Sequence, residues 1–136
     1  METLKKMDNS LKNNLKISPI EINEIRYLLL NLGLSTRGEG GKYLIAAILN
    51  CYYSPEYFTK LDDILKIVGD EFNIPTENVR SKIRSRLSTF NNSYNYNEHE
   101  LYFKIFIFKQ KITPKVFLEY FTLYLDSIKG NERILF

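Results

Sequence analysis

The stretch IVGDEFNIPTENVRSKIRSRLSTF, residues 67–90, has the pattern of a short helix, a tight turn and a second helix. Gly69 falls where the first helix must let the second approach closely, since glycine has no side chain to obstruct the contact. Asn73 tolerates the left-handed backbone of a turn, and Thr76 can cap the helix that follows. The stretch therefore predicts a helix-turn-helix.

The second helix of this stretch divides into two faces at 100° per residue. The apolar face, which predicts contact with a core, carries Val79, Ile83, Leu87 and Phe90. The opposite face carries an amide, small hydroxyls and one arginine, namely Asn78, Ser81, Arg84, Ser85 and Ser88. Since Glu77 is the one acid nearby, a DNA groove can approach this face closely.

An arginine in the middle of such a face can bond both acceptors on a guanine edge, worth about 1–3 kcal/mol of discrimination. We therefore predict that Arg84 reads a base. The full set of predicted base contacts is Asn78, Ser81, Arg84 and Ser85. The predicted phosphate contacts on the same helix are Thr76, Arg80, Lys82, Arg86 and Ser88.

The alternative interpretation of the same residues is the ordinary solvated face of an amphipathic helix. Arg86 projects near the apolar face, so its stem can cover the edge of the core while its head reaches water or phosphate.

Before this stretch, the sequence predicts two helices and a loop. Ser18 can cap a helix, a proline follows at the first helical position, and the side chain of Glu21 can reach back to the cap amide. These residues predict a helix start, and Gly33 predicts the end of that helix. The expected inner stripe is Ile22, Ile25, Leu29 and Leu32. The segment LSTRGEGG, residues 34–41, is glycine-rich and predicts a connecting loop; it lacks the Lys-Ser/Thr ending of a nucleotide-binding loop.

Further elements are predicted on both sides of the stretch. Residues 43–53 predict a buried helix that ends before Pro55, and residues 57–65 a short helix. Residues 91–100 predict a polar loop, while 101–109 suit a strand or a short helix, of which we favour the helix.

Thr113 and Pro114 predict the start of the last helix, and Gly130 predicts its end. The expected apolar side of this helix is Phe117, Phe121, Leu125 and Ile128. Aromatic residues at helical spacing there, namely Phe117, Tyr120, Phe121 and Tyr124, favour core packing, with a dimer seam as the alternative.

Length and composition indicate one all-α domain. The chain has 136 residues, 44% of them hydrophobic, and a formal charge of +3, which is too small to identify a nucleic-acid binder without clustering of the charges. Residues 1–17 predict a polar arm or marginal helix, and residues 18–136 a single helical DNA-binding domain. Neither a signal peptide nor an apolar stretch of roughly 20 residues is present, so we expect a cytoplasmic protein without a membrane partner.

Enzymatic residue patterns are missing from the sequence. The single His99 lies in a polar stretch, and the single Cys51 lies in a buried helix pattern. Asp62 and Asp63 are adjacent and would point about 100° apart on a helix, so they do not converge. We expect no catalytic residue, no metal and no cofactor.

Three separated blocks resemble one known family, the C-terminal DNA-binding domain of the response regulator that starts sporulation in endospore-forming bacteria. The blocks, within residues 20–128, are Gly33-Leu34 through Ala47-Ile48, then Phe72-Asn73 with Val79, Ile83 and Arg84, then KITPKVFL at 111–118. The resemblance implies a six-helix, bundle-like fold containing the helix-turn-helix, and a transcription regulator that binds short asymmetric sites on double-stranded DNA as tandem subunits. A homodimer is the alternative to tandem binding, and RNA polymerase is a further candidate partner.

The resemblance also bears on which residues of the predicted DNA-binding site match the family. Of four base-facing family positions, which correspond to Asn78, Arg80, Ser81 and Arg84, only Arg84 keeps the family residue, so the family's target sequence does not carry over. In the loop before the second helix, the resemblance implies a phosphate contact at Arg37, whereas Glu39 would repel a phosphate. Residues 1–17 are too few for the family's receiver domain, so we expect no control by aspartyl phosphorylation within this chain.

Two functions therefore compete. The first is a stand-alone, sequence-specific DNA-binding transcription regulator with residues 76–90 in the major groove. The second is a protein-interaction module that antagonises or recruits a related regulator, which Glu39 and the altered helix motivate.

Overall fold

The computed structural model describes residues 17–54, 60–93 and 112–131. Within these ranges it contains helices and no strand. The helices are α2 (Ile22–Asn31), α3 (Gly38–Tyr52), α4 (Leu61–Phe72), α5 (Thr76–Ser93) and α7 (Pro114–Lys129). The all-α prediction is confirmed for this part of the chain. The predictions for residues 1–16, 55–59 and 94–109, His99 among them, lie outside it.

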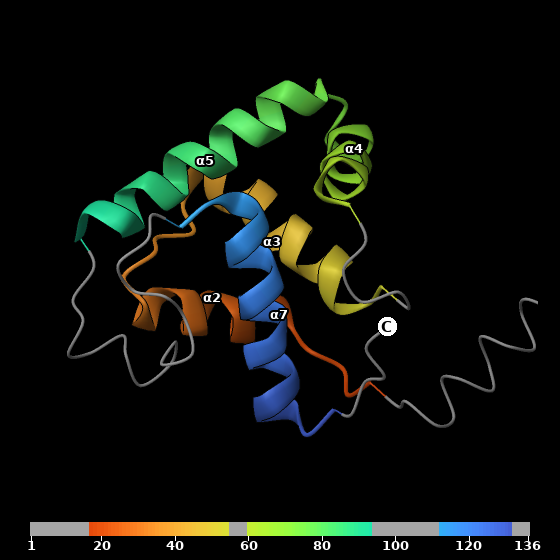
Figure 1. Cartoon of the computed structure of the whole chain (residues 1–136), viewed down its shortest axis with the longest axis vertical. Coiled ribbons are helices and arrows are strands. Elements are labelled where there is room, and N and C mark those ends of the chain that lie inside the picture. The colour runs from red at the N-terminus through yellow and green to blue at the C-terminus, as the bar shows by residue number, and fades with distance from the viewer. Residues whose placement is uncertain (1–16, 55–59, 94–111, 132–136) are drawn as a thin grey trace, which may run out of the picture.

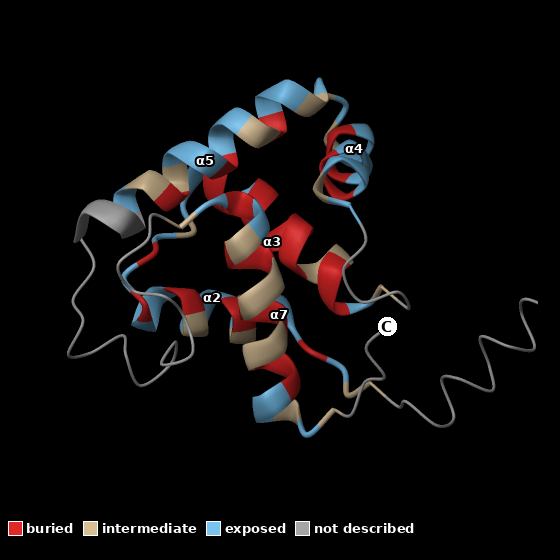
Figure 2. Ribbon diagram, in the orientation of Figure 1, coloured by how far each residue is buried: buried red, intermediate tan, exposed pale blue. Residues whose placement is uncertain are grey.

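Helix α3 occupies the centre of the arrangement and packs against the other four helices (Figure 1). Ten of its 15 residues are buried, so it is covered on nearly all sides (Figure 2). In Figure 1, α5 lies along one edge of the molecule, α4 is seen end-on beside it, and α2 lies at the opposite edge. The surface of α5 that faces away from α3 is therefore at the periphery.

The start of α2 differs from the prediction. The helix begins at Ile22, where Glu21 and Glu24 form a capping box, and not behind a cap at Ser18. Ser18 is instead used over a long range: its amide donates to Asn131 Oδ1 at 2.8 Å and its hydroxyl to the carbonyl of Lys129 at 3.3 Å. The predicted inner position of Ile22 is also wrong, because its side chain is 46% exposed, whereas Ile25, Leu29 and Leu32 are buried as predicted.

The loop prediction for residues 34–41 holds for residues 34–37, which are not helical, and is wrong for residues 38–41, which begin a helix. Gly38, Gly40 and Gly41 all belong to the first turn of α3. A Cβ on Gly41 would lie 2.2 Å from the carbonyl group of Thr36, and one on Gly40 would lie 3.2 Å from the Lys82 carbonyl oxygen. The glycines therefore serve close approach of backbones, a packing need that outweighs their low helix propensity.

Helix α4 runs without interruption from Leu61 to Phe72, which corrects the prediction of two shorter pieces. The turn that follows is as predicted, with Asn73 left-handed at φ 57°. A Cβ on Gly69 would lie 2.7 Å from the carbonyl oxygen of Ile74, so glycine is required for the chain to fold back against α4. Thr76 is the first residue of α5 and not its cap, because the Pro75 carbonyl already accepts from the amide of Asn78 at 3.0 Å.

Helix α7 confirms both of its predicted boundaries. The Thr113 hydroxyl oxygen accepts from the Val116 amide at 3.3 Å, and Gly130 ends the helix at φ 70°. Phe117 and Phe121 stack with ring centroids 5.2 Å apart and are fully buried, which favours core packing over a dimer seam. Ile128, predicted on the apolar side, is 46% exposed.

A salt bridge joins α2 to the end of α7. Lys129 Nζ lies 2.7 Å from Glu24 Oε2, and Glu24 also accepts from the amide of Glu21. The hydrogen bond with Lys129, followed by that with Glu21, lowers the pKa of Glu24 below its ordinary value. The same bond raises the pKa of Lys129.

Replacing Gly69 with alanine tests the close turn. Helix propensity alone predicts that the Gly69→Ala variant gains about 1 kcal/mol. Because the new Cβ would meet the Ile74 carbonyl, we expect a loss of about 1–3 kcal/mol in the free energy of unfolding, measured by chemical denaturation. Lys66→Ala, at an exposed position on the same helix, should change stability by less than about 0.5 kcal/mol. A stabilised Gly69→Ala variant would show that the contact is not close.

The pair of Glu24 and Lys129 predicts a pH effect. A carboxyl with a lowered folded pKa contributes stability that is fully present above its unfolded value, near 4.5, and is lost as pH falls through the folded pKa. Lys129→Gln should therefore unfold more easily than the wild type at neutral pH, and the difference should narrow below pH 4.5. Denaturation at a series of pH values measures it, with Lys115→Gln on the same helix as control. A difference that stays constant to the acid end of the series would contradict the pairing.

Candidate nucleic-acid interface

Helix α5 separates a buried stripe from an exposed polar strip. Val79, Ile83 and Leu87 are at most 1% exposed, which confirms the predicted core face at these three positions; the side chain of Phe90, the fourth predicted member, lies outside the described part of the structure. The four predicted base-contacting residues are all exposed and lie on the outward side of the helix, namely Asn78, Ser81, Arg84 and Ser85. We call these four residues the α5 strip. In Figure 2, exposed residues alternate with buried ones along α5.

Arg80 has partners within the protein. Its guanidinium donates to Asp62 on α4 and, at 3.3 Å, to Glu77 one turn earlier on α5. These bonds, with that to Asp62 the stronger, raise the pKa of Arg80. A phosphate at Arg80 would have to compete with two carboxylates, so the evident role of this arginine is to join α4 to α5.

Arg86 also acts inside the fold. Its Nη2 donates to the carbonyl oxygen of Arg37 at 2.6 Å, and its side chain is half-buried beside Gly40. The bond fixes the residue that precedes α3, which agrees with the alternative that Arg86 is partly structural. The side chain of Arg37 itself is exposed.

A shallow hollow of about 250 Å³ lies between α5 and the first turn of α3. Its lining comprises Glu39, Gly40, Lys82, Ser85, Arg86 and Thr89. Lys82 Nζ lies 4.0 Å from Glu39 Oε1, so the predicted phosphate contact has a competing carboxylate beside it. This juxtaposition was not predicted from the sequence, because the glycines were expected in a loop. Their closeness to one another, which suits tight packing of two backbones, could have indicated it.

Glu39 has a second partner in Tyr43. The Tyr43 hydroxyl donates to Glu39 Oε2 at 3.1 Å, and burial, followed by this bond, raises the pKa of Tyr43. The bond holds the carboxylate at the start of α3, where a negative charge is favourable to the helix. Thr76 and Ser88, the remaining predicted phosphate contacts, are half-buried at other points along α5.

Two other kinds of feature, a metal centre and a membrane-spanning helix, were sought in the part of the chain that the structure describes. No three His, Cys, Asp or Glu side chains there are grouped so that they could hold a metal ion. Within the same ranges, no helix is both long and apolar enough to cross a lipid bilayer.

Comparisons with known proteins give no match: no family model fits the chain, and no curated protein or solved structure is detectably similar to it. The functional argument therefore rests on the residues and their geometry.

The role of Arg80 in joining α4 to α5 can be tested with a double-mutant cycle. Arg80→Ala, Asp62→Ala and the double variant should give a coupling energy of about 0.5–1 kcal/mol, because the pair joins two helices and the arginine is only 21% exposed. The pair Lys66 and Asp70 on α4, exposed on both sides at 3.5 Å, is the control and should couple more weakly. Equal coupling in the two pairs would leave Arg80 without a special role in joining the helices.

Proposed function

We propose that this protein is a sequence-specific, double-stranded-DNA-binding transcription regulator. The observation that carries the proposal is the α5 strip: three small polar side chains and Arg84 exposed together on the outward side of a helix whose inward side is core. Side chains of these types can bond base edges while the backbone of the helix stays close to the groove floor.

The arrangement of α4 and α5 supports the proposal. In a helix-turn-helix, the first helix crosses the DNA backbone while the second enters the major groove. Here a three-residue turn joins α4 to α5, and the 18 residues of α5 extend about 27 Å. Because α5 lies at the edge of the molecule (Figure 1), a duplex can reach it without displacing another described helix.

Phosphate contacts are expected beside the strip. Lys82 and Arg37 carry exposed cationic side chains near the start of α3, whose first amides add partial positive charge. Arg80 and Arg86 support the interface indirectly, by holding α4 and the residue before α3 in place. Thr76 and Ser88 are retained as weaker candidates because each is half-buried.

The proposal extends to the resemblance set out above. We propose a six-helix domain with a helix-turn-helix that acts in the cytoplasm, like the effector domain of the sporulation response regulator; the described helices support the all-α part of this proposal. Binding as tandem subunits or a homodimer, and contact with RNA polymerase, belong to the same proposal.

A protein-interaction module is the second candidate. Glu39 beside Lys82 weakens the attraction of the α5 side for phosphate. Tyr27 and Leu30, each 66% exposed and three residues apart on α2, present apolar surface at the opposite edge of the molecule. Exposed apolar pairs of this kind suit a protein partner.

Selection from a random DNA library, followed by affinity measurement on the winning duplex, tests the proposal. We expect Arg84→Ala to weaken binding by about 1–3 kcal/mol and to relax preference at the position that Arg84 reads. Lys82→Ala should weaken binding to all sequences and reduce the salt slope by about one.

The matched control is Arg26→Ala, which removes the same charge from an exposed position on α2, away from α5. It should leave sequence preference unchanged. If no motif is enriched and binding is weak and insensitive to salt, DNA recognition is wrong and the protein-interaction module stands.

A further inference from the structure

Helix α2 carries an apolar surface that no other described helix covers. Tyr27 and Leu30 are each 66% exposed, on the side of α2 turned away from the buried Ile25. Arg26 lies beside them and donates from Nη1 to Asn23 Oδ1 at 3.4 Å. Among the described residues, Arg26 forms no salt bridge. We call these exposed residues, Asn23, Arg26, Tyr27 and Leu30, the α2 face; it combines two large apolar groups with one positive charge.

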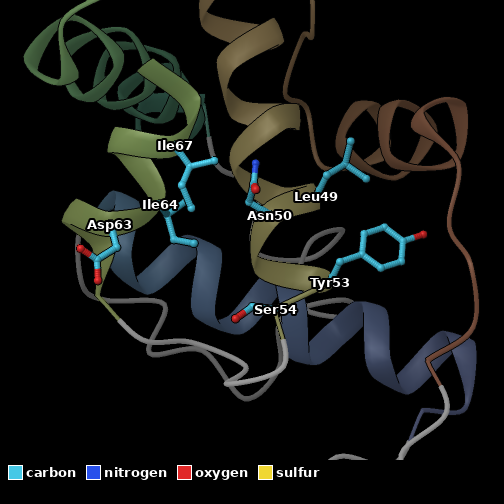
Figure 3. Close-up of a pocket in the computed structure, with 7 residues that line it drawn as sticks. All are labelled: Leu49, Asn50, Tyr53, Ser54, Asp63, Ile64 and Ile67. Atoms are coloured by element: carbon cyan, nitrogen blue, oxygen red, sulfur yellow. The ribbon is translucent and has the colours of Figure 1, made fainter. Parts of the chain in front are cut away.

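An open groove between the end of α3 and the first two turns of α4 is also apolar (Figure 3). Its volume is about 440 Å³. Its apolar lining, which we call the α4 groove, comprises Leu49, Tyr53, Ile64 and Ile67. Tyr53 and Ile67 are each 48% exposed, although large apolar side chains are more often covered. A side chain that entered the groove would cover apolar surface that water now contacts, which is favourable.

One wall of the α4 groove is held in a fixed position. The Tyr53 hydroxyl accepts from the amide of Ile20 at 2.9 Å and donates to the carbonyl of the same residue at 3.3 Å. The ring is thereby anchored to the segment before α2. Because this wall is already ordered, binding against it costs little conformational entropy.

Acidic side chains border the α4 groove. Asp63 and Glu71 are exposed and lie four residues before and four residues after Ile67, so all three share one side of α4. In Figure 3 the Asp63 carboxylate points away from Asn50 on α3. Within the described ranges neither Asp63 nor Glu71 forms a salt bridge, whereas Lys66 is already paired within α4. The border of the groove is therefore negative, and the α2 face is positive.

The positions of the two surfaces favour a contact between copies of the chain. In Figure 1, α2 and α4 lie on different sides of α3. Contact between unlike surfaces of identical chains is head-to-tail, and each copy then needs two separate surfaces that complement each other. The α2 face and the α4 groove meet this need in charge and in apolar character. The α5 strip belongs to neither surface, so it stays exposed in every copy.

We propose that the α2 face of one copy of this chain docks into the α4 groove of a second copy. Tyr27 and Leu30 of the first copy pack on the groove lining of the second. Arg26 faces the acidic border and sets the orientation of the contact. Each contact uses one α2 face and one α4 groove, so the contact can repeat from copy to copy and does not close into a two-fold pair. The proposal does not rest on DNA binding, and its test contains no DNA.

Sedimentation equilibrium of the full chain, up to millimolar concentration, measures this self-association. We expect the weight-average mass to rise above that of the monomer as the protein concentration increases. The association should weaken as salt is added, because the charged groups at the contact are exposed and are screened. Arg26→Gln should weaken it by about two- to fivefold, and Arg26→Lys by less, because lysine keeps the charge.

Two further variants separate the surfaces. Leu30→Glu disables the α2 face, and Ile67→Glu disables the α4 groove. Each variant alone should remain monomeric where the wild type associates, since every contact needs both surfaces. Mixed in equal amounts, the two should form a dimer that does not grow, because one keeps its groove and the other keeps its face. Ile128→Glu, at a 46% exposed position of α7, is the control and should associate as the wild type does.

Two results would overturn the proposal. One is a wild-type chain that stays monomeric over the whole concentration range, which would leave the two surfaces to a different partner. The other is a mixture of Leu30→Glu and Ile67→Glu that stays monomeric, or either variant alone associating as tightly as the wild type. Amide spectra of each variant establish that it is folded.

Discussion

Burial of α3 is the constraint on which the rest of the structure depends. Its residues are apolar or small on nearly every side, so each of the other described helices covers a different part of it. The packing around α3 is tightest at its first turn, where Gly40 lies against α5 and Gly41 lies against Thr36. A Cβ at Gly41 would clash with the Thr36 carbonyl group, and a Cβ at Gly40 would press on the Lys82 carbonyl oxygen and the Arg86 side chain of α5.

This packing determines which basic side chains on α5 remain available to contact DNA. Because Val79, Ile83 and Leu87 face α3, the flanks of α5 come close to α4 on one side and to the start of α3 on the other. Arg80 meets Asp62 on the first flank and Arg86 meets the Arg37 carbonyl on the second. Arg84 lies on neither flank and faces away from the core, so the packing leaves its side chain exposed. Neighbouring helices thus give different roles to three arginines within seven residues.

The sequence predicted features whose cause is local. The left-handed turn at Asn73, the cap at Thr113 and the apolar stripe of α5 each depend on residues a few positions apart. Ser18 was assigned wrongly because its partners lie more than 100 positions away at the end of α7. The partner of Arg80 is likewise on another helix, 18 residues earlier. Helical periodicity identifies which side of α5 faces outward, but it contains no information on which charges a neighbouring helix will neutralise.

This neutralisation affects how the proposed regulator would bind DNA. Non-specific attraction depends on the number of phosphates that cations neutralise. Of the four basic side chains on α5 that were predicted to contact DNA, two have partners inside the fold, and Lys82 has Glu39 nearby. One domain would therefore gain little affinity from the phosphate backbone and would depend on contacts to base edges. Two domains that also contact one another on adjacent sites would recover affinity, because once the first is bound the second binds at a high effective concentration. The modest positive surface thus favours recognition by paired subunits over tight binding by one.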